Sequence, residues 1–500
     1  MTVLKHALNE LASCLTIHSV LDLARRFSET YQDLAKSSTE HFLTTPVTTL
    51  PTGKEQGRFL AIDVGGSNLR VGIVELTGQP TTTEDGEHQT DDPVSTSIKR
   101  CHDRSWPIGD HLKMDQAEDL FRWIGDCMAE VIREAIESSS IPAEHDVQLG
   151  VTFSFPMAQT SLSEAILLPM GKGFAITSNM KLGAMLLAGY SPHCTTAGTA
   201  SSDPLPKIRI AAITNDTVAT YLSLAYAVKA APNSRVAMGL IVGTGTNATV
   251  PMRPIDLHVE KQSQLHDSSG NGSVVINTEW TIRGTDAPLE ALNIKTKWDR
   301  VLDENSGAPG FQPFEYMTSG RYLGEIARLV FLDTLGEATN PSSVPGTLQQ
   351  KNSLPTWFLS EVVARSDKES LPSHLQERYP SVSADHFWTP ARAESLREIA
   401  RAVQQRSSAL IAAACVGLLD CVGDISLSKD SKPDKEDADE LVIAYTGGTI
   451  SQYPCWLDDC QRWLDELISA SGTNHGKRLV LKEALDGGIV GAGVLAGMAQ

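Results

Sequence analysis

The first 56 residues carry apolar side chains at the spacing of one face of a helix. Apolar residues recur every three to four positions in two successive sets, a period typical of amphipathic helices. We therefore predict that residues 1–56 are helical. The sets are Leu4, Leu8, Leu11, Cys14 and Leu15, followed by Leu21, Leu23, Ala24, Phe27 and Tyr31.

A different pattern begins at residue 59. Two apolar runs, 59–63 and 69–75, flank the glycine pair Gly65-Gly66. Strand-like runs on either side of a tight glycine turn predict a β-hairpin. Helical spacing of apolar residues returns over 116–137, where we predict a helix.

Short apolar strands and helices alternate along the rest of the chain. This order predicts an α/β fold, in which helices cover the faces of the sheets. Polar patches interrupt it, and we interpret them as surface insertions because periodic elements resume soon after each patch. The predicted strands are 147–155, 208–213, 238–242, 274–277 and 441–445, two predicted helices are 217–228 and 319–335, and the patches are 79–97, 191–206, 262–273, 338–354 and 427–440.

Length and charge narrow the class of protein. The chain has 500 residues, of which 41% are hydrophobic and 21% are charged. This length exceeds what one hydrophobic core usually supports, so we expect two lobes, or about two to three domains. The net charge of −19 disfavours nucleic acid and anionic lipid as partners, because bulk attraction to them is absent.

Cysteine usage and the N-terminal sequence indicate the compartment. The eight cysteines form no CxxC pair and no metal-ligand spacing with histidine, which favours free thiols in a reducing compartment. The N-terminus lacks an apolar signal core, and no stretch approaches the roughly 20 apolar residues that span a bilayer. We expect a cytoplasmic protein without a membrane partner or a metal cluster, either a monomer or a homodimer.

Three glycine turns, at 63–70, 243–247 and 446–449, directly follow predicted strands. Nucleotide phosphates need converging backbone N–H groups with no side chains in the way, and glycine provides this. Each turn alone fits an ordinary surface hairpin turn equally well. Together they favour a phosphate site held between two lobes, although none has the Walker A or dinucleotide-binding sequence.

Several segments resemble hexokinases. Residues 63–71 resemble the first phosphate-binding hairpin of that family, 149–156 its sugar-loop strand, and 214–220 the segment with its catalytic aspartate. The likeness covers about residues 58 to 497 and implies the actin-like ATPase fold, which is ribonuclease H-like, with two lobes and a deep cleft that closes on a sugar. Further matching segments, in family order, are 243–248, 276–280, 314–317, 319–328 and 486–493.

The resemblance also implies how the chain divides into lobes. The small lobe would comprise 57–215 and 486–500, with the first phosphate hairpin and the sugar loop. The large lobe would comprise 1–56 and 216–485, with the catalytic aspartate, the second phosphate turn and the adenosine site.

Asp216 is the candidate general base. A carboxylate beside a sugar hydroxyl accepts its proton, and the corresponding aspartate has this role in hexokinases. Taken alone, the run Asn215-Asp216-Thr217 fits a helix N-cap better, and both roles can hold. By resemblance, Lys172 would face the sugar and the transferring phosphate, and Arg70 would stabilise charge on the transferring group.

Mg²⁺, ATP and a sugar are the ligands that the resemblance implies. Asp63 would act on Mg²⁺ through water, because magnesium keeps several waters and uses few carboxylates. Carboxylates and amides suit sugar hydroxyls, although Glu315 taken alone fits better as a solvated charge at a helix start. The residues implied for the sugar are Ser154, Phe155, Gly171, Lys172, Asn215, Asp216, Asn247, Glu279 and Glu315. Those implied for Mg-ATP are Asp63, Gly65, Gly66, Ser67, Asn68, Arg70, Gly243, Thr244, Gly245, Thr246, Gly447, Gly448 and Thr449.

Two positions depart from the family's pattern. Glucose-phosphorylating hexokinases usually carry Trp-Thr-Lys-Gly-Phe in the sugar loop, and here Met170-Gly171 replaces the Trp-Thr pair. The loop gains room and loses a hydrogen bond that typically contributes about 0.5–1.5 kcal/mol. The run resembles that of fungal N-acetylglucosamine kinases and predicts a sugar bulkier than glucose. Thr446 stands where the family usually has Asp, which affects details of nucleotide contact.

Three interpretations of the function remain open at this point. The main one is an ATP-dependent kinase that phosphorylates the 6-hydroxyl of N-acetylglucosamine. The first alternative is a glucose or broad-range hexokinase with a relaxed sugar loop. The second is a catalytically silent sugar sensor or regulator on the same scaffold. Loss of the sugar-loop Thr favours the silent protein, whereas retention of Asp216, Lys172 and Arg70 argues against it.

Overall fold

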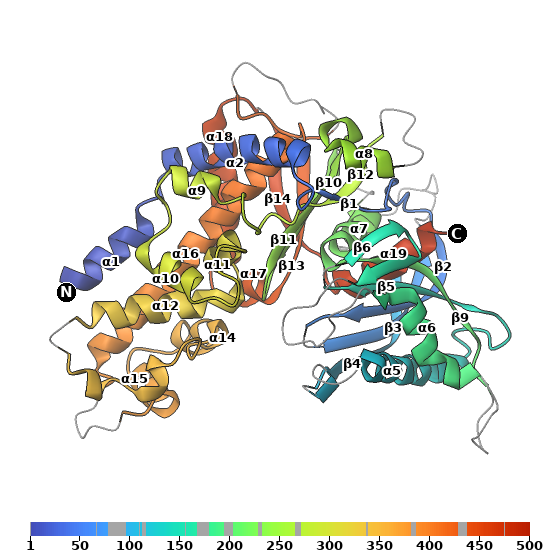
Figure 1. Ribbon diagram of the computed structural model, residues 1–500, viewed down its shortest axis with the longest axis horizontal. Coiled ribbons are helices and arrows are strands. Elements are labelled where there is room, and N and C mark those ends of the chain that lie inside the picture. The colour runs from blue at the N-terminus through green and yellow to red at the C-terminus, as the bar shows by residue number, and fades with distance from the viewer. Residues whose placement is uncertain are drawn as a thin grey trace, which may run out of the picture.

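The computed structural model describes residues 2–66, 68–78, 97–109, 111–112, 117–155, 157–167, 180–194, 204–228, 233–265, 272–336, 339–381, 387–428, 438–474 and 476–500. Two lobes, each built on a β-sheet, lie side by side (Figure 1). The predicted two-lobed α/β fold is therefore confirmed. The predicted lobe boundaries at 215/216 and 485/486 stay a prediction.

The first lobe contains a five-stranded sheet in the order β4-β3-β2-β5-β9. Successive side chains of β2 point to opposite faces, and both faces are buried. Leu60 and Ile62 pack in the core with α5, while Phe59 and Ala61 pack with α19. The strands are β2 (Gln56–Val64), β3 (Asn68–Thr77), β4 (Ile98–Pro107), β5 (Val147–Phe153) and β9 (Ile208–Thr214); the helices are α5 (Ala117–Glu137), α6 (Leu182–Tyr190) and α19 (Gly487–Met498). A small sheet adds β6 (Met157–Ser161), β7 (Glu164–Leu167) and β8 (Met180–Lys181).

The second lobe contains a six-stranded sheet in the order β1-β12-β11-β10-β13-β14. Helices α2, α16 and α18 pack in the core on one face of it, and α7 packs against the other. The strands are β1 (Leu43–Thr44), β10 (Ser234–Val242), β11 (Thr246–Met252), β12 (Val274–Asn277), β13 (Glu440–Thr446) and β14 (Arg478–Glu483).

Helices make up the rest of the second lobe. The long ones are α1 (Thr2–Ala12), α2 (Ile17–Ser37), α7 (Asp216–Val228), α12 (Gly320–Thr334), α16 (Pro390–Cys421) and α18 (Trp456–Ser471). The short ones are α8 (Val259–Gln264), α9 (Ala287–Ala291), α10 (Lys297–Glu304), α11 (Pro313–Thr318), α13 (Gly346–Gln349), α14 (Thr356–Phe358), α15 (Leu371–Arg378) and α17 (Gly448–Gln452). Short helical turns of this lobe lie at Pro254–Asp256, Pro341–Ser343 and Leu359–Val363, and a further one at Ser191–Cys194 packs on α5 and α6 in the first lobe.

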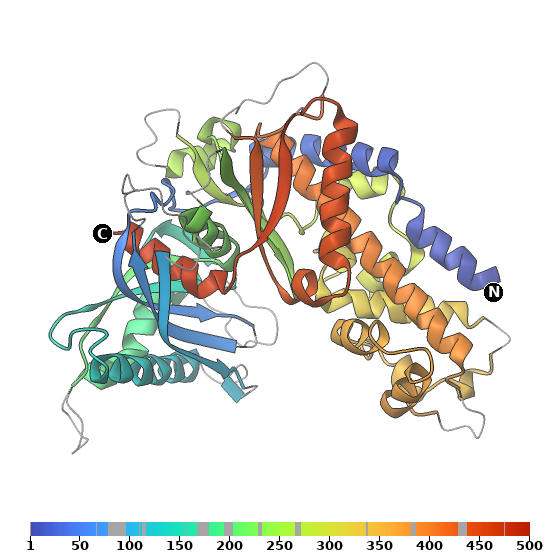
Figure 2. The same cartoon turned by 180° about the vertical axis from the view of Figure 1, so that it is seen from behind.

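Helices α7 and α19 join the lobes. After α18 in the second lobe, the chain returns to the first lobe as its C-terminal helix α19 (Figures 1 and 2). Helix α19 lies along α7, and α7 in turn packs on β10 of the second lobe. A Cβ atom at Gly491 would lie 2.1 Å from the carbonyl oxygen of Ala219, so the two backbones touch directly. This contact places the N-terminal ends of both helices close together.

Most of the predicted elements are confirmed, with three corrections. The helical prediction for 1–56 is wrong after Ser37, because Leu43 and Thr44 pair with β12 instead. The patches 191–206, 338–354 and 427–440 are not entirely surface, since Leu205, Leu348 and Leu427 are buried in the core. The sequence pattern also suggested no segment able to span a bilayer. By length and composition alone, helix α16 could cross a bilayer, but 89% of its most apolar stretch is buried inside the protein.

Candidate active site

The first glycine turn is a hairpin, as predicted. Asp63 near the end of β2 pairs in register with Arg70 of β3, and the Gly65 N–H donates to the Asn68 carbonyl oxygen at 2.9 Å. Gly65 and Gly66 are partly exposed and Asn68 is exposed, so the backbone of this turn is accessible. Ser67 lies outside the described residues.

Asp486 is a member of this site to which the sequence analysis gave no role. It adopts a left-handed conformation with φ 50° immediately before α19. Its carboxylate pairs with Arg70 through Oδ1 at 3.3 Å and with Arg100 through Oδ2 at 2.6 Å. A polar residue directly before an apolar helix is a recognisable sequence signal, but its pairing with Arg70 depends on the fold.

Asp63 lies in a strongly acidic setting. Its carboxylate is against the first turn of α19, where a Cβ atom at Gly488 would be 2.4 Å from its Oδ2. The pKa of Asp63 is raised to about 7, chiefly by burial; the Arg70 guanidinium lowers it, and the nearby Asp216 and Asp486 carboxylates add to the rise. Magnesium keeps several waters and uses few carboxylates, so a carboxylate in this position suits Mg²⁺ held through water.

Asn215 and Asp216 divide two roles that the sequence could not separate. The Asn215 side-chain oxygen accepts a hydrogen bond from the Val218 N–H at 2.9 Å and so caps α7. Asp216 is the first residue of α7, and within the described part of the chain its carboxylate accepts only a long contact, 3.4 Å, from the Thr217 hydroxyl. Asn215 is therefore the cap. The Asp216 carboxylate is not used for capping and lies close enough to Asp63 to influence its pKa.

A second cluster, called the sugar cluster, contains amide and carboxylate residues that are predicted to bind sugar. The Asn247 side-chain amide donates to Asn277 Oδ1 at 2.7 Å, and the Asn277 side-chain amide donates to Glu279 Oε1 at 2.8 Å. Glu315 Oε2 accepts from the Thr246 backbone N–H at 3.3 Å. Asn277, which the sequence analysis did not select, therefore links Asn247 to Glu279.

The second and third glycine turns contact each other in the second lobe. The Gly243 carbonyl oxygen accepts from the Gly320 N–H at 2.7 Å and from the Thr449 hydroxyl at 3.0 Å. The Thr244 carbonyl oxygen accepts from the Arg321 N–H at 3.2 Å, at the start of α12. The third turn is not a hairpin as its sequence suggested, because it runs from β13 directly into α17, which includes Gly448.

The sugar-loop strand lies beside the first hairpin. The Ser154 N–H donates to the Val64 carbonyl oxygen at 3.0 Å, so Ser154 lies close to Asp63 in space. Phe155 is buried, with its ring 5.1 Å from that of Phe153. Gly171 and Lys172 lie outside the described residues, as does Met170.

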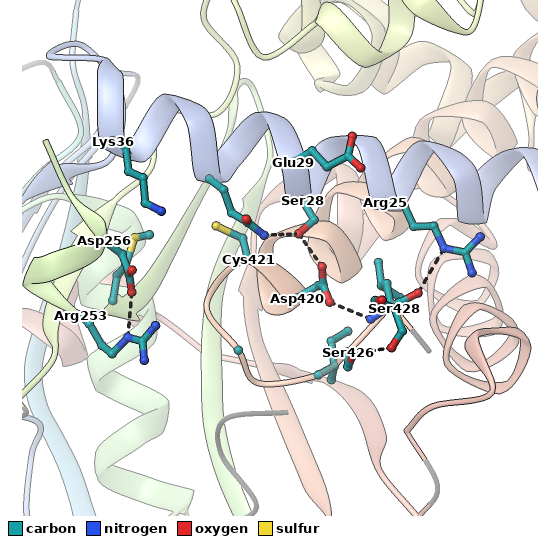
Figure 3. A pocket seen from close by; sticks show the side chains of 15 residues that line it. Arg25, Ser28, Glu29, Lys36, Arg253, Asp256, Asp420, Cys421, Ser426 and Ser428 are labelled. Atoms are coloured by element: carbon teal, nitrogen blue, oxygen red, sulfur yellow. Dashed lines mark hydrogen bonds and ion pairs between the residues drawn. The ribbon is translucent and has the colours of Figure 1, made fainter. Parts of the chain in front are cut away.

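A cavity of about 740 Å³ lies apart from these clusters. It is bounded by α2, the C-terminal end of α16 and the turn at Pro254–Asp256 (Figure 3). Asp420 at its centre accepts hydrogen bonds from the Ser28 hydroxyl at 2.5 Å and the Leu427 N–H at 2.7 Å. Of the residues predicted for the sugar or for Mg-ATP, none of those that the structure describes lines this cavity.

The chain is similar to known proteins both in sequence and in fold. One family model described as hexokinase matches residues 7–226, and a second with the same description matches residues 237–498. The chain is 31% identical to hexokinase-1 of Nicotiana tabacum over 462 residues, which cover 91% of this chain and 82% of the relative. It is 30% identical to hexokinase-5 of Oryza sativa subsp. japonica over 464 residues, with 91% and 80% covered. Among solved structures, a hexokinase from Schistosoma mansoni complexed with glucose has the same fold, with a TM-score of 0.73, 24% identity and 99% of each chain covered.

Proposed function

This chain belongs to the hexokinase family, whose members use Mg-ATP, and we propose that it transfers the γ-phosphoryl group of ATP to the 6-hydroxyl of a hexose. The observation that carries the proposal is the grouping of Asp63, Arg70 and Asp216 at the adjacent ends of α7 and α19. Phosphoryl transfer requires positioning and charge stabilisation more than covalent help from the protein. One base, one metal-directed carboxylate and one cation in a single group meet that requirement.

Each member of the group has a distinct task in the proposed reaction. Asp216 accepts the proton of the attacking sugar hydroxyl, because its carboxylate is not used to cap α7. Asp63 holds Mg²⁺ through water, and Arg70 balances the charge that spreads over the transferring group. To contact a phosphate, the Arg70 guanidinium must give up its ion pair with Asp486. That pair, at 3.3 Å and partly exposed, contributes little free energy, so the change of partner costs little.

The proposed substrate is glucose or a broader range of hexoses. The curated relatives carry the name hexokinase, and the related Schistosoma structure was determined with glucose. Asn247, Glu279 and Glu315 supply amide and carboxylate groups that take sugar hydroxyls.

N-acetylglucosamine is the second candidate substrate. One observation favours it, namely Met170-Gly171 in place of the Trp-Thr pair of glucose-phosphorylating hexokinases. A smaller and more flexible pair leaves room for a bulkier sugar.

A coupled ADP-release assay tests the proposal. Purified protein with Mg-ATP is given glucose, mannose or N-acetylglucosamine, and sugar binding is measured separately by calorimetry. Turnover on glucose or mannose supports the main proposal, and highest turnover on N-acetylglucosamine supports the second candidate. Sugar binding without turnover on any of the three contradicts the kinase proposal and leaves a silent sugar sensor.

A further inference from the structure

Lys261 is a buried lysine that holds a backbone turn. It lies on α8 with only 5% of its surface exposed, and its Nζ donates to the Ser38 carbonyl oxygen at 2.5 Å and to the His41 carbonyl oxygen. Among the described residues, the ammonium donates to these carbonyls and not to a carboxylate. Burial lowers the pKa of this ammonium to about 8. A buried ammonium is costly unless it is well hydrogen-bonded, so these two bonds fix its position.

The turn that Lys261 holds leads directly into the sugar cluster. Inside the turn, the Ser38 hydroxyl contacts the His41 ring at 2.8 Å. The next residue, Phe42, has φ 50° and donates its N–H to the Thr278 carbonyl oxygen at 3.0 Å. The chain then pairs Leu43 with Asn277 in the sheet. The turn is thus fastened to the two residues that precede Glu279.

Glu279 depends on such support because its backbone is strained. Its φ of 49° lies in the left-handed region, which is strained for a non-glycine residue and persists only where the surroundings enforce it. The Asn277 amide holds its side chain at 2.8 Å, and the Phe42 N–H holds the carbonyl that precedes it.

We propose that Lys261 is a positioning residue for sugar binding. By closing the turn at Ser38 and His41, it keeps Phe42 on the Thr278 carbonyl and thereby keeps the Glu279 carboxylate directed at the sugar. Lys261 itself does not touch the sugar. The inference rests on the proposed function in one respect, namely that Glu279 binds the hexose.

The test compares Lys261→Met and Lys261→Arg with Lys295→Met as a matched control. Lys295 is also a mostly buried lysine of the second lobe, but it pairs with Asp286 and Glu290. Lys261→Met should raise the hexose Kd and KM roughly tenfold, the effect of about 1.4 kcal/mol, and leave the KM for Mg-ATP unchanged. Lys261→Arg should recover most of the affinity, because a guanidinium also donates to two carbonyls.

The control separates positioning from general stability. Lys295→Met should lower the Tm without changing the hexose Kd. An unchanged hexose Kd in Lys261→Met, or equal losses for hexose and Mg-ATP, overturns the proposal. If Lys261→Met does not fold, Ser38→Ala removes the hydroxyl contacts inside the same turn and leaves the Lys261 ammonium bonded to both carbonyls, and an unchanged hexose Kd in that variant also overturns the proposal.

Calorimetric Kd values distinguish this proposal from the kinase proposal. Wild-type protein that binds hexose without turnover contradicts the kinase proposal but leaves the effect of Lys261 measurable. Wild-type protein that binds no hexose removes the role of Glu279, and the positioning role falls with it.

Discussion

At the scale of single residues, two neighbours in the candidate active site, Asn215 and Asp216, have different roles. Asn215 caps α7 at 2.9 Å from the Val218 N–H, and this leaves Asp216 available for chemistry. The run Asn215-Asp216-Thr217 predicts an N-cap, but the sequence does not say which side-chain oxygen accepts the hydrogen bond from the backbone of α7. That choice depends on backbone dihedrals, which the tertiary structure sets.

Replacing Asp216 by Asn should abolish most turnover without unfolding the protein. Loss of a general base typically lowers kcat about 10²–10⁴-fold. The Asn215 cap is untouched, so the Tm should match that of the wild type, and calorimetry should still detect sugar binding. A kcat within a factor of about two of the wild type would show that another group takes the proton.

Replacing Asp63 by Asn should stabilise the ligand-free protein in a pH-dependent way. The pKa of Asp63 is about 7 in the folded protein, above the value near 3.9 of an unfolded chain. Between these two values the folded state binds more protons, so the free energy of unfolding contributed by this group falls as pH rises. The destabilisation caused by the ionised Asp63 carboxylate is complete above pH 7, and it is absent at acidic pH, where the carboxyl is neutral.

Thermal unfolding of Asp63→Asn and wild type from about pH 4 to pH 8 checks this prediction. The variant should gain Tm relative to the wild type as pH rises, even though activity with Mg-ATP is lost. The exposed Asp465→Asn serves as control and should show no such trend. A constant Tm difference for Asp63→Asn over this range would mean that Asp63 is already ionised at low pH.

At the scale of elements, the contact between α7 and α19 sets the position of Asp216, the proposed general base. Gly491 lies on α19 against the carbonyl oxygen of Ala219, one turn into α7 from Asp216. Gly491→Ala would place a Cβ atom 2.1 Å from that oxygen, so the helices must move apart. Such overpacking typically costs about 1–3 kcal/mol.

Both stability and turnover should therefore fall in Gly491→Ala. Gly346→Ala is the control, because a Cβ atom there meets no other atom within 4 Å. Urea unfolding and the ADP-release assay provide the two measurements. A variant that loses stability but keeps full kcat would show that Asp216 is positioned independently of α19.

Elements that depend on the residue pattern of one segment can be predicted from the sequence. Elements that form by pairing with residues far away in the sequence cannot. The hairpin of β2 and β3 was found because a glycine pair separates two apolar runs that pair with each other. Strand β1 was missed because Leu43 and Thr44 become a strand only by pairing with Asn277 and Ile276. The pairing of Asp486 with Arg70 was missed for the same reason, since these residues are far apart in sequence.

At the scale of the whole molecule, the candidate ligand sites draw on different parts of the fold. The sugar cluster lies near β11 and β12, with Asp216 on α7 and Ser154 after β5 of the first lobe. The turns predicted for the nucleotide, with Gly243 and Thr449, belong to the second lobe and contact each other there. Residue patterns indicated two lobes and the α/β class, and the resemblance supplied the rest of the arrangement.

Sugar and nucleotide should therefore stabilise the protein through separable groups. A ligand at about 100 times its Kd adds about 2.7 kcal/mol to the free energy of unfolding, which thermal shift detects. Glu279→Gln should lose the shift caused by hexose and keep the shift caused by Mg-ADP. Thr449→Val removes the hydroxyl that bonds to the Gly243 carbonyl, so it should weaken the Mg-ADP shift and spare the hexose shift. Loss of both shifts in either variant, with a ligand-free Tm equal to that of the wild type, would contradict this prediction. It would mean that each ligand binds only when both clusters are intact, so that the two sites form one coupled unit.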